Sequence, residues 1–237
     1  MRVSFSFLIL CLLTAIGINP ASAKFENIKR IGVISAIGDT FTVQKVGITV
    51  FGNEKTQFAI GSWRIDEFVI DRIRAALGRR FDVRPVTYQK AAFFPQNRGL
   101  FGSSTSAIPD AVRAHVSPQG FDAYVVVTKA GSGYGQTNQV VNALGIVDGS
   151  GLLVANISVF ALYAITVVDG RQFTVLGQAS GPQPGFFVSI HGPSREVDKS
   201  WWPTALDAAH NPKLKGTITE LLTQNLPQTL QKLELVK

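Results

Sequence analysis

The chain has little cysteine and few charges, and both shortages narrow its possible functions. Its one cysteine, Cys11, lies in an apolar stretch near the start of the 237 residues. The rest of the chain therefore cannot hold disulfides, a catalytic thiolate or cysteine-ligated zinc or iron–sulfur sites. Charged residues make up 16% of the sequence, below the roughly 25% of typical soluble domains. We therefore expect a sheet-rich domain with a large buried core.

The first 23 residues have the pattern of a secretory signal peptide. Arg2 gives a short positive region, residues 5–18 are apolar, and Ala21-Ser22-Ala23 has small residues where signal peptidase reads them. An uncleaved anchor helix is the alternative, but helix-weakening residues precede the small ones. We expect cleavage after Ala23, and a periplasmic or secreted protein.

The charge of the mature chain bears on its partners. Removing Arg2 from 23 basic residues leaves 22 against 16 acidic ones, a formal charge of +6. This modest charge favours loose attraction to anionic lipid headgroups or cell-wall polymers. No nucleic-acid-binding motif is present, so we expect no nucleic-acid partner. The residues before Cys11 are not the small ones that precede a lipid-modified cysteine, so we expect no lipoprotein.

Patterns in the first half predict two strands and a helix. Residues 31–36 and 40–50 read as strands, and Gly38-Asp39 between them is typical of a tight hairpin turn. Ser62 is the expected cap of a helix with one apolar stripe. The stripe consists of Ile65, Val69, Ile73 and Leu77.

The second half adds a buried strand and two helices. Residues 121–129 are almost all apolar, as in a strand covered on both faces. Residues 108–116 form a short predicted helix. Asn211 and Pro212 begin a last helix, which we expect Pro227 to break.

Residues 149–168, GSGLLVANISVFALYAITVV, carry no charge over twenty positions, about the length of a membrane span. Asp148-Gly149 and Asp169-Gly170 bracket the run as hairpin turns do. Its apolar residues also follow a period of two, and polar side chains such as Asn156 lie on the alternate face, where lipid would make them costly. We predict sheet, bent near Ala161 because so long a strand is unusual. The mature chain is thus expected to have no transmembrane span.

No repeat and no convincing linker divides the chain after the signal peptide. We therefore expect one α/β (α+β) domain over residues 24–237, with a mixed, largely antiparallel sheet and helices packed on it.

Two loops, residues 89–107 and 181–203, concentrate aromatic side chains without a helical or strand period. Aromatic residues dominate binding hot spots. We therefore expect these loops to bind an envelope protein or an anionic cell-wall or lipid polymer. The expected binding residues are Phe93, Phe94, Phe101, Trp201 and Trp202.

Glycines at positions 131, 133 and 135 follow the buried strand, where α/β sheets often place a ligand loop. The spacing fits neither the dinucleotide fingerprint nor the phosphate-binding loop, and Ser132 lacks the flanking glycines of a nucleophile elbow. A turn between strands is the simpler interpretation. Gly131, Gly133 and Gly135 remain candidate binding residues, and we expect no cofactor.

A periplasmic hydrolase is the alternative hypothesis, with its site near Asp207 and His210 or at the glycine loop. Asp207 and His210 would share one face of a short helix, and His191 lies near Glu196 in the sequence. No catalytic or metal-binding motif accompanies them. We therefore expect no metal site and no catalytic residues, and favour a non-catalytic binding protein.

The order of elements resembles a group of periplasmic α/β domains. The segments that carry the resemblance are RIGVISAIGD, DEFVIDRIRAALGRRFDV, FDAYVVVTKAGSGYG and ALYAITVVDGRQFTVLG. They are similar in pattern to the LpoB-like and CsgG-like envelope proteins and to the amino-terminal domain of the TolB-like proteins. The first two groups carry a lipidated cysteine that this chain lacks. The resemblance implies a non-catalytic envelope role and a sheet with helices packed on it.

The signal peptide gives a first prediction. Intact-mass measurement of the protein from its native host should show the loss of residues 1–23 and a chain that begins at Lys24. A retained amino terminus would contradict the expectation of a periplasmic or secreted protein.

Overall fold

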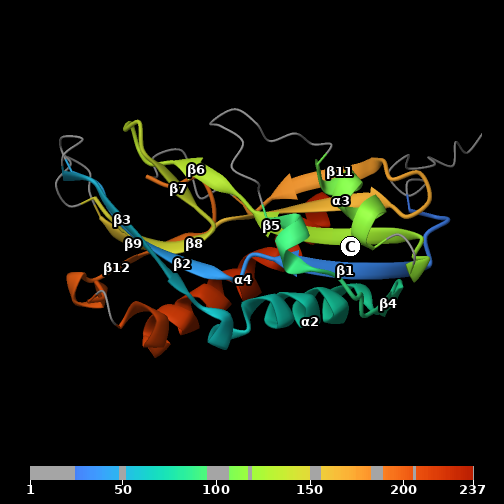
Figure 1. Cartoon of the computed structure of the whole chain (residues 1–237), viewed down its shortest axis with the longest axis horizontal. Helices are drawn as coiled ribbons and strands as arrows, with labels where there is room; N and C mark the ends of the chain where they lie inside the picture. Colours follow the sequence, from blue (N-terminus) through green and yellow to red (C-terminus); the bar gives the residue numbers. More distant parts are fainter. Residues whose placement is uncertain are drawn as a thin grey trace, which may run out of the picture.

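The structure is a computed structural model, shown in Figure 1. It describes residues 25–47, 52–94, 107–116, 119–149, 156–182, 189–204 and 207–236. The expected signal peptide, its cleavage site and Phe101 lie outside the described residues. The helices are α2 (Ile65–Leu77), α3 (Ala107–His115) and α4 (Pro212–Lys232), with short 3-10 turns at η2 (Gly61–Trp63), η3 (Lys90–Phe93), η5 (Lys199–Trp201) and η6 (Ala208–His210).

Two five-stranded sheets form the framework. Sheet A has the order β11-β10-β5-β1-β4 and sheet B the order β12-β9-β8-β2-β3, while β6 and β7 form a separate hairpin. Strand β1 is parallel to β4 and β5, and most other pairs are antiparallel. The predicted mixed, largely antiparallel α/β fold is confirmed. The strands are β1 (Arg30–Ala36), β2 (Thr40–Lys45), β3 (Glu54–Ala59), β4 (Asp82–Arg84), β5 (Ala123–Lys129), β6 (Gly131–Gly133), β7 (Val140–Asn142), β8 (Leu144–Asp148), β9 (Ile157–Ala161), β10 (Tyr163–Asp169), β11 (Val175–Ser180) and β12 (Ser194–Val197).

The described part of the uncharged run 149–168 is sheet, as predicted. Its strands β9 and β10 are separated by Leu162 alone, so the chain bends beside Ala161 and passes from sheet B into sheet A. Strand β10 continues through the predicted Asp169-Gly170 turn into its antiparallel neighbour β11. Within the described residues, no helix combines the length and the apolar character that crossing a membrane requires.

The hairpin predicted at Gly38-Asp39 is wrong. Strand β1 belongs to sheet A and β2 to sheet B, so these residues carry the chain from one sheet to the other. A Cβ atom at Gly38 would lie 2.9 Å from Cβ of Ile65 and 3.0 Å from the amide nitrogen of Asp66. Glycine is needed here because α2 approaches the backbone closely, and not because the chain reverses.

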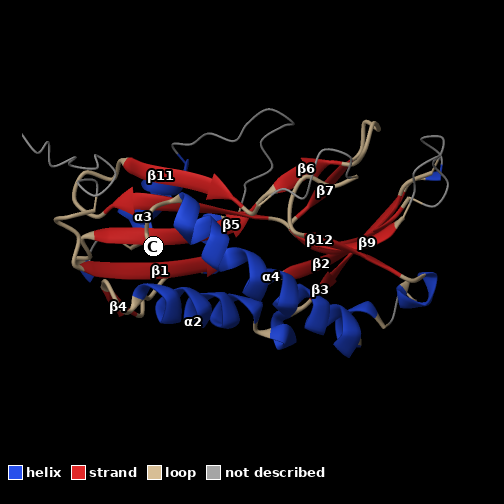
Figure 2. Cartoon of the chain, turned by 180° about the vertical axis from the view of Figure 1, so that it is seen from behind, coloured by secondary structure: helices blue, strands red, loops and turns tan. Residues whose placement is uncertain are grey.

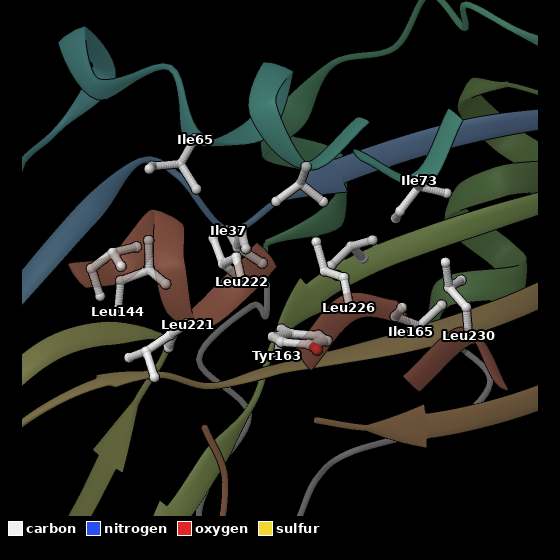
Figure 3. Packing of buried hydrophobic residues seen from close by; sticks show 14 of the residues in the cluster. Ile37, Ile65, Ile73, Leu144, Tyr163, Ile165, Leu221, Leu222, Leu226 and Leu230 are labelled. Carbon is white, nitrogen blue, oxygen red and sulfur yellow. The ribbon is translucent and has the colours of Figure 1, made fainter. Parts of the chain in front are cut away.

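The main core lies between helices α2 and α4 and one face of both sheets (Figures 1, 2). The predicted stripe of α2 is fully buried in it, and so is most of the stripe of α4. Figure 3 shows α4 side chains meeting those of α2 and of the strands around Tyr163. Because one cluster spans both sheets, the two sheets share a single core. The labelled members in Figure 3 are Ile37, Ile65, Ile73, Leu144, Tyr163, Ile165, Leu221, Leu222, Leu226 and Leu230.

A second core covers the opposite face of sheet A. Helix α3 and turn η3 pack there against Ile34, Tyr124 and Val126. Strand β5 alternates between the two cores, because Val125 and Val127 belong to the first one. The prediction of a strand covered on both faces is confirmed.

Helix α4 begins as predicted but does not break at Pro227. The Asn211 side chain accepts hydrogen bonds from the amides of Lys213 and Leu214 at its start. The helix then continues unbroken to Lys232. The proline interrupts neither face of the helix, since Leu226 before it and Leu230 after it are both buried in the main core. Burial of the helix face on both sides of Pro227 then outweighs the local cost of proline.

A buried carboxylate fixes the crossing between the sheets. Oδ1 of Asp66, in the first turn of α2, accepts hydrogen bonds from the Ser35 hydroxyl at 2.8 Å and from the amides of Ile37 at 2.8 Å and Gly38 at 3.1 Å. Its Oδ2 lies 2.9 Å from the ammonium group of Lys90. Asp66 thus joins the end of β1, the start of α2 and turn η3.

The predicted cap at Ser62 is wrong. The residue before α2 is Arg64, whose φ of 54° is left-handed and whose side chain makes no capping hydrogen bond. Ser62 lies in the preceding turn η2. Asp66, which the sequence suggested only as a favourable charge in the first turn, therefore has the larger structural role.

This arrangement predicts unequal effects of two substitutions. Asp66→Ala should lower the free energy of unfolding by about 3 kcal/mol or more, because two backbone amides and a hydroxyl lose their buried acceptor. Lys90→Gln should cost about 1 kcal/mol or less, because the Lys90 side chain is 44% exposed and exposed ion pairs contribute little. Urea denaturation of both variants measures the difference. Equal losses would show that the ion pair, and not the hydrogen bonds, secures the crossing.

Candidate functional site

A groove of about 330 Å³ lies between helix α4 and the adjoining ends of two edge strands. Pro182, just after β11, lines it together with residues 193–195 at the start of β12. Helix α4 supplies the other side from four residues spaced i, i+3, i+4 and i+7, which share one helix face. These four are Leu221, Gln224, Asn225 and Gln228.

The bend between β9 and β10 determines where this groove lies, because it brings the ends of β11 and β12 together. Strand β12 pairs with β9 and β11 pairs with β10, so both edge strands lie beside the same bent strand. Their ends meet closely, since a Cβ atom at Gly181 would lie 2.7 Å from Cδ of Pro193. The Ala161 amide donates to the Pro193 carbonyl at 2.9 Å. Helix α4 runs across the sheets on this side of the molecule (Figure 2).

The groove is polar but close to neutral. Among the described residues that line the groove, Arg195 is the ionisable one, and it pairs with Glu220 at 2.6 Å. The side-chain amide of Asn225 donates to the backbone carbonyl of Leu221 at 2.7 Å, and the side-chain amide of Gln228 donates to the backbone carbonyl of Gln224 at 3.1 Å. An amide group has two donor hydrogens and an acceptor oxygen, so each retains bonding capacity toward the groove. This surface suits an uncharged chain that offers hydrogen bonds.

The predicted aromatic residues are more buried than expected. The expectation that Phe93 forms exposed contact area is wrong, because its ring is 2% exposed and packs in the second core. Phe94 is half-buried, and the Lys129 ammonium group lies 5.0 Å from its ring centre. Trp201 and Trp202 are half-buried against the main core. Among the described residues, Val140 is the exposed large apolar side chain.

The predicted glycine loop forms the hairpin β6–β7 and its turn. A Cβ atom at Gly131 would lie 2.3 Å from Oδ1 of Asn142 on the partner strand. Gly133 faces open space, and Gly135 has a φ of +53° in the turn. At Gly135 the positive φ makes glycine a requirement of the turn itself. The proposed role of the three glycines in binding stays a prediction.

The hairpin is connected to the segment before β12. The His191 amide donates to the Ser132 hydroxyl at 2.9 Å, and Ser132 donates to the Gly133 carbonyl at 2.8 Å. Ser132 is thus bonded to backbone groups. Burial, followed by the charges of Asp148 and Glu196, raises the pKa of Tyr134 to about 12. Tyr134 is therefore a neutral hydrogen-bonding group at ordinary pH, and its hydroxyl donates to the Asn156 carbonyl at 3.3 Å.

The groups of the alternative hydrolase site lie at the surface. Asp207 and His210 are exposed, and the His210 amide donates to the Asp207 carbonyl at 3.0 Å. The Asp207 carboxylate accepts a hydrogen bond from the Thr204 hydroxyl. In the parts of the chain that are described, no group of three or more histidine, cysteine or acidic residues could hold a metal ion.

A second group of polar side chains, Asp66, Tyr88 and Lys90, lies at the carboxyl end of β1. In parallel α/β sheets, ligands often bind at this position, but here the carboxylate of Asp66 occupies the backbone amides. Burial raises the pKa of Tyr88, whose hydroxyl donates to the Ser35 carbonyl. Burial lowers the pKa of Lys90, but the hydrogen bond and charge of Asp66 outweigh it and raise the pKa above its ordinary value. The charged groups of this cluster are therefore paired.

The sequence predicted a binding role for the loop on one side of the groove, but not for helix α4 on the other side. The expected binding loop 181–203 contains Pro182 and residues 193–195, but the reasoning singled out its tryptophans. The α4 side was overlooked because only apolar periodicity was followed. The side-chain amides of Gln224, Asn225 and Gln228 form a neutral polar stripe beside the apolar one. This stripe is the signal that could have identified the α4 side of the groove.

Comparisons with known proteins give little further information. No protein-family model matches the sequence, and neither does a curated protein. One similar solved structure is the crystal structure of protein XCC0632 from Xanthomonas campestris, assigned to the family DUF330. The two chains are 9% identical, the match covers 88% of this chain and 84% of the other, and the TM-score is 0.37. The comparisons show no link to the LpoB-like, CsgG-like or TolB-like proteins.

The positions of the two neighbouring phenylalanines can be tested. Phe93→Ala should lower the free energy of unfolding by about 3–5 kcal/mol, as expected for a buried ring. Phe94→Ala should cost about 1 kcal/mol, because its ring is half-buried and loses less apolar contact. Thermal and urea unfolding of both variants gives the comparison. A small effect of Phe93→Ala would contradict the burial of this ring.

Proposed function

We propose that the protein is a non-catalytic binding module of the cell envelope, which holds a partner protein or polymer in the groove between α4 and the ends of β11 and β12. The observation that carries this proposal is the neutral, hydrogen-bonding lining of the groove, with amides on one side and two prolines on the other. Such a surface can hold a chain but offers no acid–base pair for its chemistry. The expected signal peptide supports a location in the periplasm or outside the cell.

The net positive charge and the groove have different roles in this proposal. The formal charge of +6 for the mature chain, 22 basic against 16 acidic residues, gives long-range attraction to anionic envelope surfaces. Within the groove, the pairing of Arg195 with Glu220 leaves little net charge. Specificity would therefore come from shape and hydrogen bonds, whereas charge would raise the rate of encounter.

Site-specific photocrosslinking in the native host tests the proposal. A benzophenone amino acid at position 228, inside the groove, should form an adduct with a defined partner. The matched control is position 231, which is exposed on the same helix but does not line the groove. Gln228→Trp, which fills the groove, should weaken partner capture at least tenfold, whereas Gln231→Trp should not. The same adduct at both positions, or none at 228, would contradict the proposal.

A phenotype test separates binding from catalysis. If Gln228→Trp has no effect in cells while Asp207→Ala and His210→Ala abolish function in folded protein, the hydrolase hypothesis replaces this one.

A further inference from the structure

Strand β11 is an edge of sheet A with free backbone groups on its outer side. It pairs with β10 on one side, and in the described chain no strand pairs with it on the other. The Gly181 amide donates to the Tyr163 carbonyl, and antiparallel pairs alternate between bonded and non-bonded residues. Counting along the register from that bond, the backbone groups of Gln178 and Ser180 point away from β10. Both residues are exposed.

The other edges of the two five-stranded sheets carry charges that discourage strand addition, whereas β11 does not, and the uncharged edge strands of the hairpin β6–β7 are only three residues long. Charged side chains, prolines and very short strands are the common protections of an edge. Strand β4 is the three-residue DVR followed by proline, β3 is EKTQFA, and β12 is SREV. Strand β11 is VLGQAS, without charge or proline. Its register is irregular near Val175, which leaves residues 177–180 regularly paired.

Strand β11 also leads directly to the groove. Pro182, two residues after its end, is part of the groove lining. An extended chain lying along the outer side of β11 can therefore continue into the groove and meet the amides of α4. The unprotected edge of β11 and the neutral groove are therefore neighbours along the chain, two residues apart.

We propose that β11 accepts an extended, uncharged segment of a partner polypeptide as an added strand, which continues into the groove beside Pro182. This rests on the proposed binding function and names the kind of partner. A polypeptide fits because its backbone offers the alternating donors and acceptors that the outer groups of Gln178 and Ser180 require. None of the described residues that line the groove has an aromatic ring on which a sugar could stack. A second copy of this chain fits less well, because two molecules of positive net charge repel each other.

A library of random octapeptides, selected on the mature chain, provides the probe. The enriched sequences should be uncharged and rich in β-branched residues. Gln178→Pro removes one outward N–H group and leaves the bonds between β11 and β10 in place, and the preceding Gly177 tolerates a following proline. This variant should bind an enriched peptide at least tenfold more weakly. The control Gln178→Thr keeps the N–H group and should bind within threefold of the unmodified chain.

Hydrogen exchange tests the same contact without a substitution. Addition of the enriched peptide should slow exchange of the Gln178 and Ser180 amides at least tenfold. Unchanged exchange would overturn strand addition even if Gln178→Pro fails to fold. Enrichment of charged peptides only, or of none, would overturn it as well.

Two outcomes separate this inference from the proposed function. If Gln228→Trp abolishes peptide binding and Gln178→Pro does not, the groove binds its partner without an added strand. If the unmodified chain forms a dimer that Gln178→Pro dissociates, the occupant of β11 is a second copy and the inference is wrong.

Discussion

The carboxylate of Asp66 is the constraint on which the arrangement of both sheets depends. By accepting hydrogen bonds from Ile37 and Gly38 it fixes the residues between β1 and β2, which carry the chain from one sheet to the other. Because Asp66 lies in the first turn of α2, the same bonds set the position of that helix against the crossing. A buried charge would be costly without partners, so its three hydrogen bonds and Lys90 make one arrangement much more favourable than others.

A second crossing lies at Leu162, and three backbone hydrogen bonds close it. The Leu162 amide donates to Ala143, the Ala143 amide donates to Ala130, and the Ala130 amide donates to Leu162. Ala143 adopts a left-handed φ of 59° there, a conformation that costs an alanine about 1 kcal/mol or more. The strain is tolerated because this ring of three hydrogen bonds satisfies the backbone amides and carbonyls of Ala130, Ala143 and Leu162 together. The groove exists because β11 and β12 lie on opposite sides of this crossing.

The sequence was sufficient where one periodic pattern determined the outcome. The stripe of α2 followed from apolar spacing, the doubly covered strand β5 from a near-continuous apolar run, and the bend beside Ala161 from the unusual length that one uninterrupted strand would have had. Predictions failed where tertiary contacts decided. Gly38 is required by the approach of α2, and Pro227 stays helical because α4 is held on both sides. Phe93 lies in a segment without a period, yet it is buried by α3 and sheet A, elements far from it in the sequence. The groove combines residues from distant segments, so a local pattern could indicate its α4 side but not the groove as a whole.

The position of β1 has a consequence for how the chain is made. Strand β1 lies between β4 and β5, and its register joins Ile31 to Ala123, 92 residues later. Contacts this far apart make folding slow, because a long loop must close before they form. The first strand of sheet A thus has no central neighbour until more than half of the polypeptide has been synthesised. In a nascent chain with this topology, the centre of sheet A cannot assemble before β5 has been made, so the edge of β1 that faces β5 stays unpaired until then.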